Sequence, residues 1–92
     1  MVTIIIPNFN GYAFLKDCLE ALTPQLKEDM HVLVVDNGST DESVRFLQSY
    51  EGIQTIYLSD NTGFCGAVNA GIKASRTKYV ILLNNDTKVL SG

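Results

Sequence analysis

The stretch "HVLVVDNGSTDES", residues 31–43, joins an uninterrupted apolar run to a polar cluster and decides the fold. The run "HVLVV" at 31–35 is typical of a strand that is buried on both faces, as in a parallel sheet. The polar residues after it end the strand, and Ser39 and Glu42 have the spacing of a capping box. The stretch therefore predicts a buried strand, a polar loop, and a helix from about residue 40 to about residue 50.

Three further segments have the composition of strands. Residues 2–6, "VTIII", form a β-branched run that Pro7 is expected to end. Residues 53–58, "IQTIYL", show some alternation, which favours a position nearer the edge of a sheet. In residues 78–83, "KYVILL", five apolar or aromatic residues follow Lys78 without interruption, so we expect a fourth strand that is fully buried.

Two segments between these strands have helical character. After Tyr12, apolar residues recur at the spacing of a helical stripe, and Pro24 is expected to end this helix or shape its last turn. Residues 64–75, "FCGAVNAGIKAS", predict a helix whose small residues approach a sheet or a ligand closely. A helical glycine costs about 1 kcal/mol relative to alanine, so packing or function should offset Gly66 and Gly71. The apolar stripe of the first helix consists of Leu15, Cys18, Leu19, Leu22 and Leu26.

The elements alternate as β-α-β-α-β-α-β with short connections, which predicts a parallel sheet with right-handed crossovers. The 92 residues suffice for one small domain, covering residues 1–92. We expect an α/β fold, with a three-layer α/β/α architecture and the strand order 3-2-1-4.

Polar clusters follow three of the predicted strands, at residues 8–10, 36–38 and 84–86. In parallel sheets, ligands bind beyond the carboxyl ends of the strands, where the strand order reverses. All three clusters should lie at that edge. The sequence therefore predicts a ligand site there.

Carboxylates and carboxamides dominate these clusters. Asp36 and Asp86 have no lysine or arginine nearby in the sequence to neutralise both, which favours Mg²⁺ or Mn²⁺ held together with a nucleoside diphosphate. Asn84 and Asn85 can add neutral oxygen ligands or hydrogen bonds to a ribose. The alternative for Asp86 is a helix cap or a turn residue.

Asn37 and Phe9 each have two interpretations. The amide of Asn37 can accept from the ring N–H of uracil or thymine and donate to the adjacent carbonyl, and guanine or cytosine can also face an amide. The alternative is an Asx-type turn in "DNGS". Phe9 can stack on a base or cover the end of the sheet.

Composition excludes several classes of protein. The net charge is −3, from 7 basic and 10 acidic residues, with no basic stripe that would favour nucleic-acid binding. Cys18 and Cys65 lack the spacing of a metal site, so we expect two reduced thiols packed in helices. The N-terminal apolar run is too short for a signal peptide or a membrane span, which favours a cytoplasmic protein.

Three other functions compete with a catalytic one. A phospho-receiver domain could use Asp36, but it needs an acidic pair after its first strand, where this chain has "PNFN". A dinucleotide-binding domain needs G-x-G-x-x-G, where this chain has "PNFNGY". A non-catalytic nucleotide- or partner-binding module remains as the alternative.

Four motifs, in this order, resemble the successive N-terminal motifs of family 2 glycosyltransferases with the GT-A fold: "VTIIIPNFNG", "LVVDNGSTDES", "NTGFCGAVNAGIKAS" and "YVILLNNDT". The combination of "VDNGSTD", "N-x-G-F" and "LLNND" resembles the subgroup that includes rhamnosyltransferases. Much of the family has Asp-Asp in the second motif and Asp-x-Asp in the metal motif. This chain has Asp36-Asn37 and Asn84-Asn85-Asp86 instead. The resemblance implies the N-terminal half of a GT-A, Rossmann-like domain.

The resemblance also implies roles for residues after the first two strands. Pro7, Asn8 and Phe9 would line the nucleoside pocket. Asp36 and Asn37 would hold the base and form the floor of the pocket.

Later motifs imply further contacts with the donor. Asn61 and Gly63 would shape the loop under the nucleotide, and Asn69 would border it from a helix. Asn85 would reach the ribose or the diphosphate. The implied donor is a nucleoside-diphosphate sugar, with UDP or dTDP favoured.

The remaining implications concern the reaction. Asp86, with Asn84, would coordinate Mg²⁺ or Mn²⁺ on the diphosphate, and transfer to a glycan or lipid-linked acceptor would invert the anomeric carbon. The general base would lie beyond Gly92, so this chain alone is expected to be inactive. The implied role is polysaccharide or cell-envelope synthesis, at the inner face of the membrane in the full-length protein. An unpaired edge at the fourth strand could support a homo-oligomer.

Overall fold

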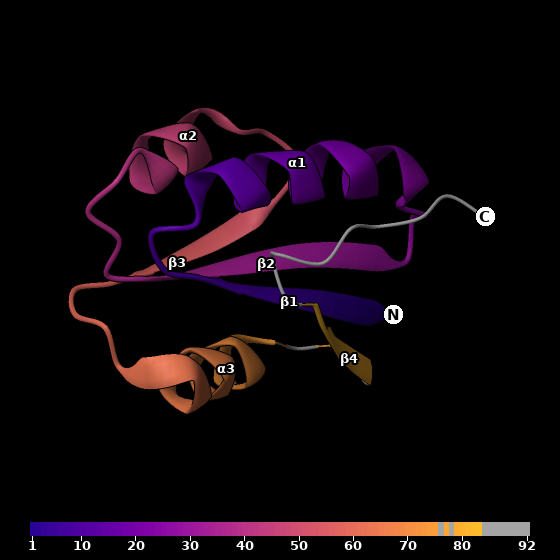
Figure 1. Cartoon of the computed structure of the whole chain (residues 1–92). Coiled ribbons are helices and arrows are strands. Elements are labelled where there is room, and N and C mark those ends of the chain that lie inside the picture. Colours follow the sequence, from indigo (N-terminus) through magenta and orange to yellow (C-terminus); the bar gives the residue numbers. More distant parts are fainter. Residues whose placement is uncertain (76, 78, 84–92) are drawn as a thin grey trace.

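The structure is a computed structural model that describes residues 1–75, 77 and 79–83. Strands and helices alternate along the chain, as the sequence predicts (Figure 1). The elements are β1 (Val2–Asn8), α1 (Tyr12–Leu22), the short 3₁₀ helix η1 (Thr23–Gln25), β2 (Met30–Asn37), α2 (Ser43–Ser49), β3 (Gln54–Leu58), α3 (Gly63–Ala74) and β4 (Tyr79–Leu82).

The strands form one parallel sheet in the order β3-β2-β1-β4, which confirms the predicted order. Helices α1 and α2 cover one face of the sheet and α3 covers the other, so the three-layer architecture is also confirmed (Figure 1). β3 is an edge strand, as its alternation predicts. Among the described residues, no helix has the length and apolar character needed to cross a membrane.

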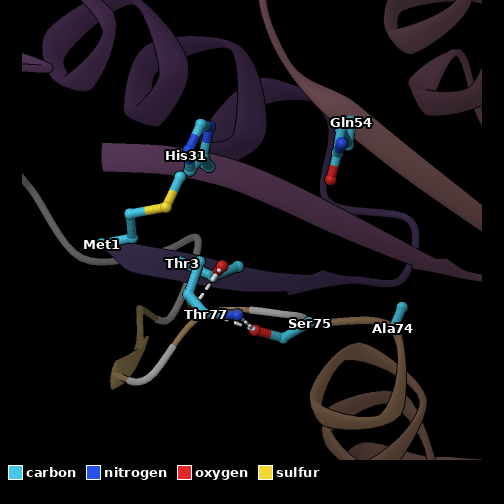
Figure 2. Close-up of a pocket in the computed structure, with 7 residues that line it drawn as sticks. All are labelled: Met1, Thr3, His31, Gln54, Ala74, Ser75 and Thr77. Carbon is cyan, nitrogen blue, oxygen red and sulfur yellow. Dashed lines mark hydrogen bonds between the residues drawn. The ribbon is translucent and has the colours of Figure 1, made fainter. Parts of the chain in front are cut away.

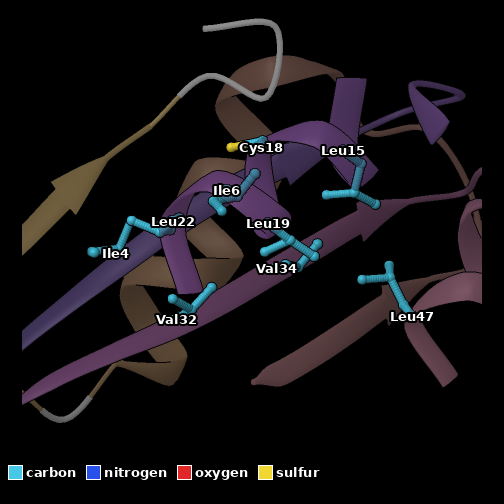
Figure 3. Packing of buried hydrophobic residues seen from close by; sticks show 9 residues of the cluster. All are labelled: Ile4, Ile6, Leu15, Cys18, Leu19, Leu22, Val32, Val34 and Leu47. Carbon is cyan, nitrogen blue, oxygen red and sulfur yellow. The ribbon is translucent and has the colours of Figure 1, made fainter. Parts of the chain in front are cut away.

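The larger core lies between the sheet and α1 with α2 (Figure 3). The predicted stripe faces this core, but Leu26 lies beyond the end of α1 and packs against the core only partly buried. Pro24 explains the difference, because η1 ends the helical path and Leu26 takes an extended conformation. The buried members of this core are Ile4, Ile6, Leu15, Cys18, Leu19, Leu22, Val32, Val34 and Leu47.

The opposite face is covered by α3, whose small residues allow close packing. Ala67 is buried against Ile5 and Val35. A Cβ on Gly71 would lie 2.7 Å from Cγ2 of Ile5, so only glycine fits without displacing the sheet. The predicted close approach of this helix to the sheet is thus confirmed.

The sequence predicted that β1 ends at Pro7, but the strand continues to Asn8. The carbonyl of Ile5 accepts a hydrogen bond from Leu83, so the backbone of Ile5 faces β4. Pro7, two residues later, faces the same side, beyond the last register pair of β1 with β4 at Ile5 and Leu82. The missing N–H of proline therefore removes no bond of this ladder.

The prediction that the fourth strand is fully buried is wrong. All four residues of β4 are exposed, from 40% for Val80 to 59% for Tyr79. β4 is the edge strand beside β1, and α3 packs over β1 and β2 instead. An apolar run alone does not reveal whether a neighbouring layer covers the strand.

Two smaller predictions also need correction. α2 begins at Ser43 rather than near Thr40, and Ser39 forms no capping box because its hydroxyl bonds to Asp36. Cys18 is buried, which raises the pKa of its thiol, whereas Cys65 is exposed on α3 rather than packed.

Candidate functional site

Three loops meet at the carboxyl ends of β1, β2 and β3. The register pairs Asn8 with Asp36 and Asn37 with Leu58, so the three strands end at one level. We call the loops at residues 9–11, 38–42 and 59–62, together with the strand ends, the rim. The predicted clusters at 8–10 and 36–38 lie on the rim. The cluster at 84–86 lies outside the described residues.

Asp36 joins the ends of β1 and β2. Its side chain is 1% exposed, and Oδ1 accepts hydrogen bonds from Asn8 Nδ2 at 3.0 Å and Ser39 Oγ at 2.7 Å. Oδ2 accepts from the backbone amide of Ser39 at 3.0 Å. Both carboxylate oxygens thus bind neutral protein donors, so Asp36 serves as a structural anchor of the rim and is poorly suited to hold a metal ion.

Asn10 joins the first loop to the second. Its Oδ1 accepts hydrogen bonds from the backbone amides of Thr40 at 2.7 Å and Asp41 at 3.2 Å. The backbone N–H of Asn10 donates a hydrogen bond to Ser39 Oγ at 2.9 Å. Asn10 has φ of 50°, a left-handed conformation that asparagine tolerates better than most residues.

Asp41 fixes the start of α1 to the second loop. Its carboxylate accepts hydrogen bonds from the backbone amides of Tyr12 at 3.1 Å and Ser43 at 2.9 Å. Slight burial acts to raise the pKa of Asp41, but the hydrogen bonds from Ser43 and Tyr12 outweigh it and lower the pKa below its ordinary value.

Asn37 joins the second loop to the third. Its side chain is 4% exposed, and Nδ2 donates to Asn61 Oδ1 and to the carbonyl of Gly63, both at 3.0 Å. Its Oδ1 accepts from the backbone amide of Thr62 at 2.9 Å and from Thr62 Oγ1 at 3.0 Å. The neighbouring Gly38 lies against the third loop, where a Cβ would be 2.8 Å from the backbone carbon of Asp60.

The other predicted nucleotide-binding residues differ in exposure. Pro7 and Asn8 are buried beneath the loops, whereas Phe9 is 47% exposed at the tip of the first loop. Asn61, Gly63 and Asn69 are also exposed, on the third loop and α3. The rim therefore has a buried polar floor and an exposed aromatic side chain. Asn85 lies outside the described residues.

A metal site is not visible in the part of the chain that the structure describes. Within residues 1–75, 77 and 79–83, no group of three or more His, Cys, Asp or Glu side chains could hold an ion. The predicted ligands Asn84 and Asp86 lie outside these residues. β4 runs parallel to β1, so its carboxyl end is directed toward the end of the sheet where the rim lies.

A separate pocket of about 340 Å³ lies at the opposite end of the sheet from the rim, near the amino ends of β1 and β2 (Figure 2). Thr3 and His31 line it from the first residues of β1 and β2, and Thr3 Oγ1 lies 2.7 Å from Thr77 Oγ1. Its lining contains hydroxyl, amide and imidazole groups but no carboxylate, lysine or arginine among the described residues. We therefore place the candidate site at the rim.

Residues 3–91 match the family model of glycosyl transferase family 2, and this match covers almost all of the chain and every rim residue described above. The chain belongs to this family. The resemblance of the motifs to family 2 is thus confirmed at the level of the family.

Curated glycosyltransferases match along the chain. An uncharacterized glycosyltransferase of Rickettsia prowazekii is 36% identical over 87 residues, which are 94% of this chain and 27% of that protein. A putative teichuronic acid biosynthesis glycosyltransferase, TuaG of Bacillus subtilis, is 29% identical over 96% of this chain and 36% of its own length. The chain thus spans about a quarter to a third of these relatives.

Solved structures share the fold. TarS of S. aureus superposes with a TM-score of 0.85 at 24% identity, over 95% of this chain and 28% of the solved TarS chain, and has also been solved with UDP-GlcNAc. The mannosyltransferase PcManGT of Pyrobaculum calidifontis, solved with GDP-Man and Mn²⁺, gives 0.78 at 20% identity, over 95% of this chain and 28% of that chain. The predicted fold class, the N-terminal Rossmann-like half of a GT-A domain, is confirmed.

Sequence reasoning missed part of the rim. Asn10, Ser39 and Thr62 each connect two loops, yet the motifs assign none of them a role. The first two are visible in "PNFN" and "DNGST" as small polar residues next to assigned ones. Their partners lie about 30 positions away, which no local pattern reveals.

Proposed function

We propose that this chain is the donor-nucleotide-binding part of a family 2 glycosyltransferase. The enzyme transfers a sugar from a nucleoside-diphosphate sugar to a glycan or lipid-linked acceptor, in polysaccharide or cell-envelope synthesis. The observation that carries this proposal is the rim, where a buried polar floor and an exposed Phe9 lie at the carboxyl ends of three parallel strands. The role of TuaG supports an envelope polymer as the product.

The proposed donor carries UDP or dTDP. The structure of TarS with UDP-GlcNAc supports a uridine nucleotide, and that of PcManGT with GDP-Man makes GDP the natural competitor to test. Phe9 would stack on the base, above a floor of Pro7, Asn8 and the Asp36–Asn37 pair.

The exposed polar residues of the rim complete the donor site in this proposal. Asn61 and Gly63 would lie under the nucleotide, and Asn69 beside it on α3. Asn85 would contact the ribose or the diphosphate.

The proposed reaction inverts the anomeric carbon. An acceptor hydroxyl attacks that carbon on the face opposite the diphosphate, and the carbon–oxygen bond to the diphosphate breaks. The general base would come from sequence beyond this chain. A Mg²⁺ or Mn²⁺ ion would supply positive charge to the leaving diphosphate, and we assign Asp86 and Asn84 to it. The Mn²⁺ in the PcManGT structure supports such an ion. The described rim residues supply no ligand set for that ion.

We also propose a subgroup, a cellular location and an oligomeric contact for the full-length enzyme. The motif combination favours the rhamnosyltransferase-like subgroup, and the full-length enzyme would work in the cytoplasm at the inner face of the membrane. The exposed edge at β4 would pair with a second copy, because its four apolar side chains are all exposed. The 92-residue chain alone would bind nucleotide without transferring sugar.

Calorimetric titration of the 92-residue chain with UDP, dTDP and GDP, with and without Mn²⁺, tests the proposal. We expect binding that weakens roughly tenfold in Phe9→Ala, because base stacking on an aromatic side chain contributes about 1–3 kcal/mol. Tyr79→Ala is the matched control, since Tyr79 is exposed to 59% at the start of β4, in register with Val2 at the opposite end of the sheet from the rim. Absence of binding to all three nucleotides by the folded chain, or an equal loss in both variants, would contradict the proposal.

A further inference from the structure

The side-chain amide of Asn37 has no hydrogen-bonding capacity left. A carboxamide has two donor hydrogens and one oxygen with two lone pairs. Nδ2 donates to Asn61 Oδ1 and the Gly63 carbonyl, and Oδ1 accepts twice from Thr62. A base that bound this amide edge would have to displace two or more of these bonds.

The orientation of this amide is fixed by backbone groups. Oδ1 faces the N–H of Thr62, which only donates, and Nδ2 faces the carbonyl of Gly63, which only accepts. Asn61 is fixed in the same way, because its Oδ1 accepts from the N–H of Gly63 at 2.8 Å. Rotation of either amide by half a turn would place donors against donors.

The same bonds define where α3 begins. Gly63, the first residue of α3, has φ of +80° and is bonded through its carbonyl to Asn37 and through its N–H to Asn61. Thr62 packs over the first turn of α3, where a Cβ on Gly66 would lie 2.7 Å from Thr62 Cβ. A continuous set of contacts therefore runs from the end of β2 through the third loop into α3.

We propose that Asn37 is a positioning residue that sets the third loop and the start of α3 beneath the donor, and that it does not recognise the base. This inference rests on the proposed function. It replaces both interpretations of Asn37, because the side-chain bonds that the structure gives go to the third loop and to Gly63 rather than within "DNGS". Discrimination between bases then falls to other groups around Phe9.

An aspartate in place of Asn37, as much of the family has, would break the arrangement in this chain. The carboxylate could still accept from Thr62, but it could not donate to Asn61 Oδ1 or to the carbonyl of Gly63. Its charge would also be buried with no cation among the partners that Asn37 has.

The experiment compares Asn37→Asp and Asn61→Ala with a control, Gln48→Ala, on the exposed side of α2. Asn61 is exposed, so Asn61→Ala keeps the fold even if Asn37→Asp does not. In the nucleotide-free chain, we expect the Gly63 amide to exchange with solvent about tenfold faster in Asn61→Ala, because its acceptor is lost. The Gln48→Ala variant should exchange as the unaltered chain does.

Affinities for UDP, dTDP and GDP supply the second readout. Each variant at Asn37 or Asn61 should weaken all three by the same factor, roughly tenfold, and the double variant should be little worse than either single one. Loss confined to one base in Asn37→Asp would overturn the inference, as would unchanged Gly63 exchange in Asn61→Ala. If the unaltered chain binds no nucleotide, the proposed function fails, while the exchange data still decide the positioning role of the pair.

Discussion

The rim and β4 show opposite relations between side chain and surroundings. On the rim, polar side chains such as Asp36 and Asn37 are buried and hydrogen-bonded to neighbouring loops. On β4, apolar side chains such as Val80 and Ile81 are exposed. The difference shows that the rim is already formed within this chain, whereas no neighbouring layer among the described residues covers β4.

The largest expected change in the free energy of unfolding comes from a substitution at Gly38 on the rim. In Gly38→Ala, the new Cβ meets the backbone of Asp60 while the residue keeps φ near +80°, so we expect a loss of about 3 kcal/mol in the free energy of unfolding. Gly52→Ala is the matched control, because Gly52 has φ of +88° and nothing within 4 Å of a Cβ. Its expected loss is about 1 kcal/mol, from backbone strain alone. Urea unfolding measures both, and equal losses would contradict tight packing between the second and third loops.

A smaller effect on stability is expected on β4. Ile81→Lys should change the free energy of unfolding by less than about 0.5 kcal/mol, because the side chain is already half exposed. It should also abolish self-association measured by sedimentation across a range of protein concentrations. Gln48→Lys, at an exposed position on α2, adds the same single positive charge and should leave association unaltered. Association that survives Ile81→Lys would exclude pairing through β4.

The smallest effect concerns Asp41 and pH. Hydrogen bonds lower the pKa of Asp41 in the folded chain, so its ionised form adds stability above the ordinary value of 3.8. That contribution is lost as the pH falls from this value through the lower folded pKa. Asp41→Asn should therefore unfold with a shallower pH dependence below about pH 4 than the unaltered chain. Urea titrations over this range measure the difference, with Asp17→Asn on the exposed side of α1 as control. Parallel pH curves for Asp41→Asn and the unaltered chain would contradict this role.

The sequence predicted the alternation of strands and helices and the end of the sheet where polar clusters meet, because both follow from alternating periodicities and from the geometry of parallel sheets. The burial of β4 could not be predicted, because "YVIL" is equally apolar whether or not a layer covers it. The capping box failed for a related reason. Ser39 is suited both to a cap and to Asp36, and only the folded chain shows that Asp36 is its partner.

For the rim, the sequence identifies several residues but not the hydrogen bonds that they make. Asp36, Asn37 and Asn8 are identifiable from their places after buried strands. Most of their bonding could not be deduced, because apart from the contact of Asp36 with Ser39 it depends on residues 24 to 31 positions away. Asn10 was predicted only as part of the cluster at 8–10. Its linking role was not, because its left-handed conformation and its bonds to the second loop have no local sequence pattern.

The shared hydrogen bonds of the rim also bear on how such enzymes can be recombined. Asn10 ties the first loop to the second, and Asn37 ties the second to the third. A chimera that receives only residues 59–62 from a relative would place foreign groups against Asn37 and Gly38. A chimera designed to change donor preference should therefore exchange all three loops together.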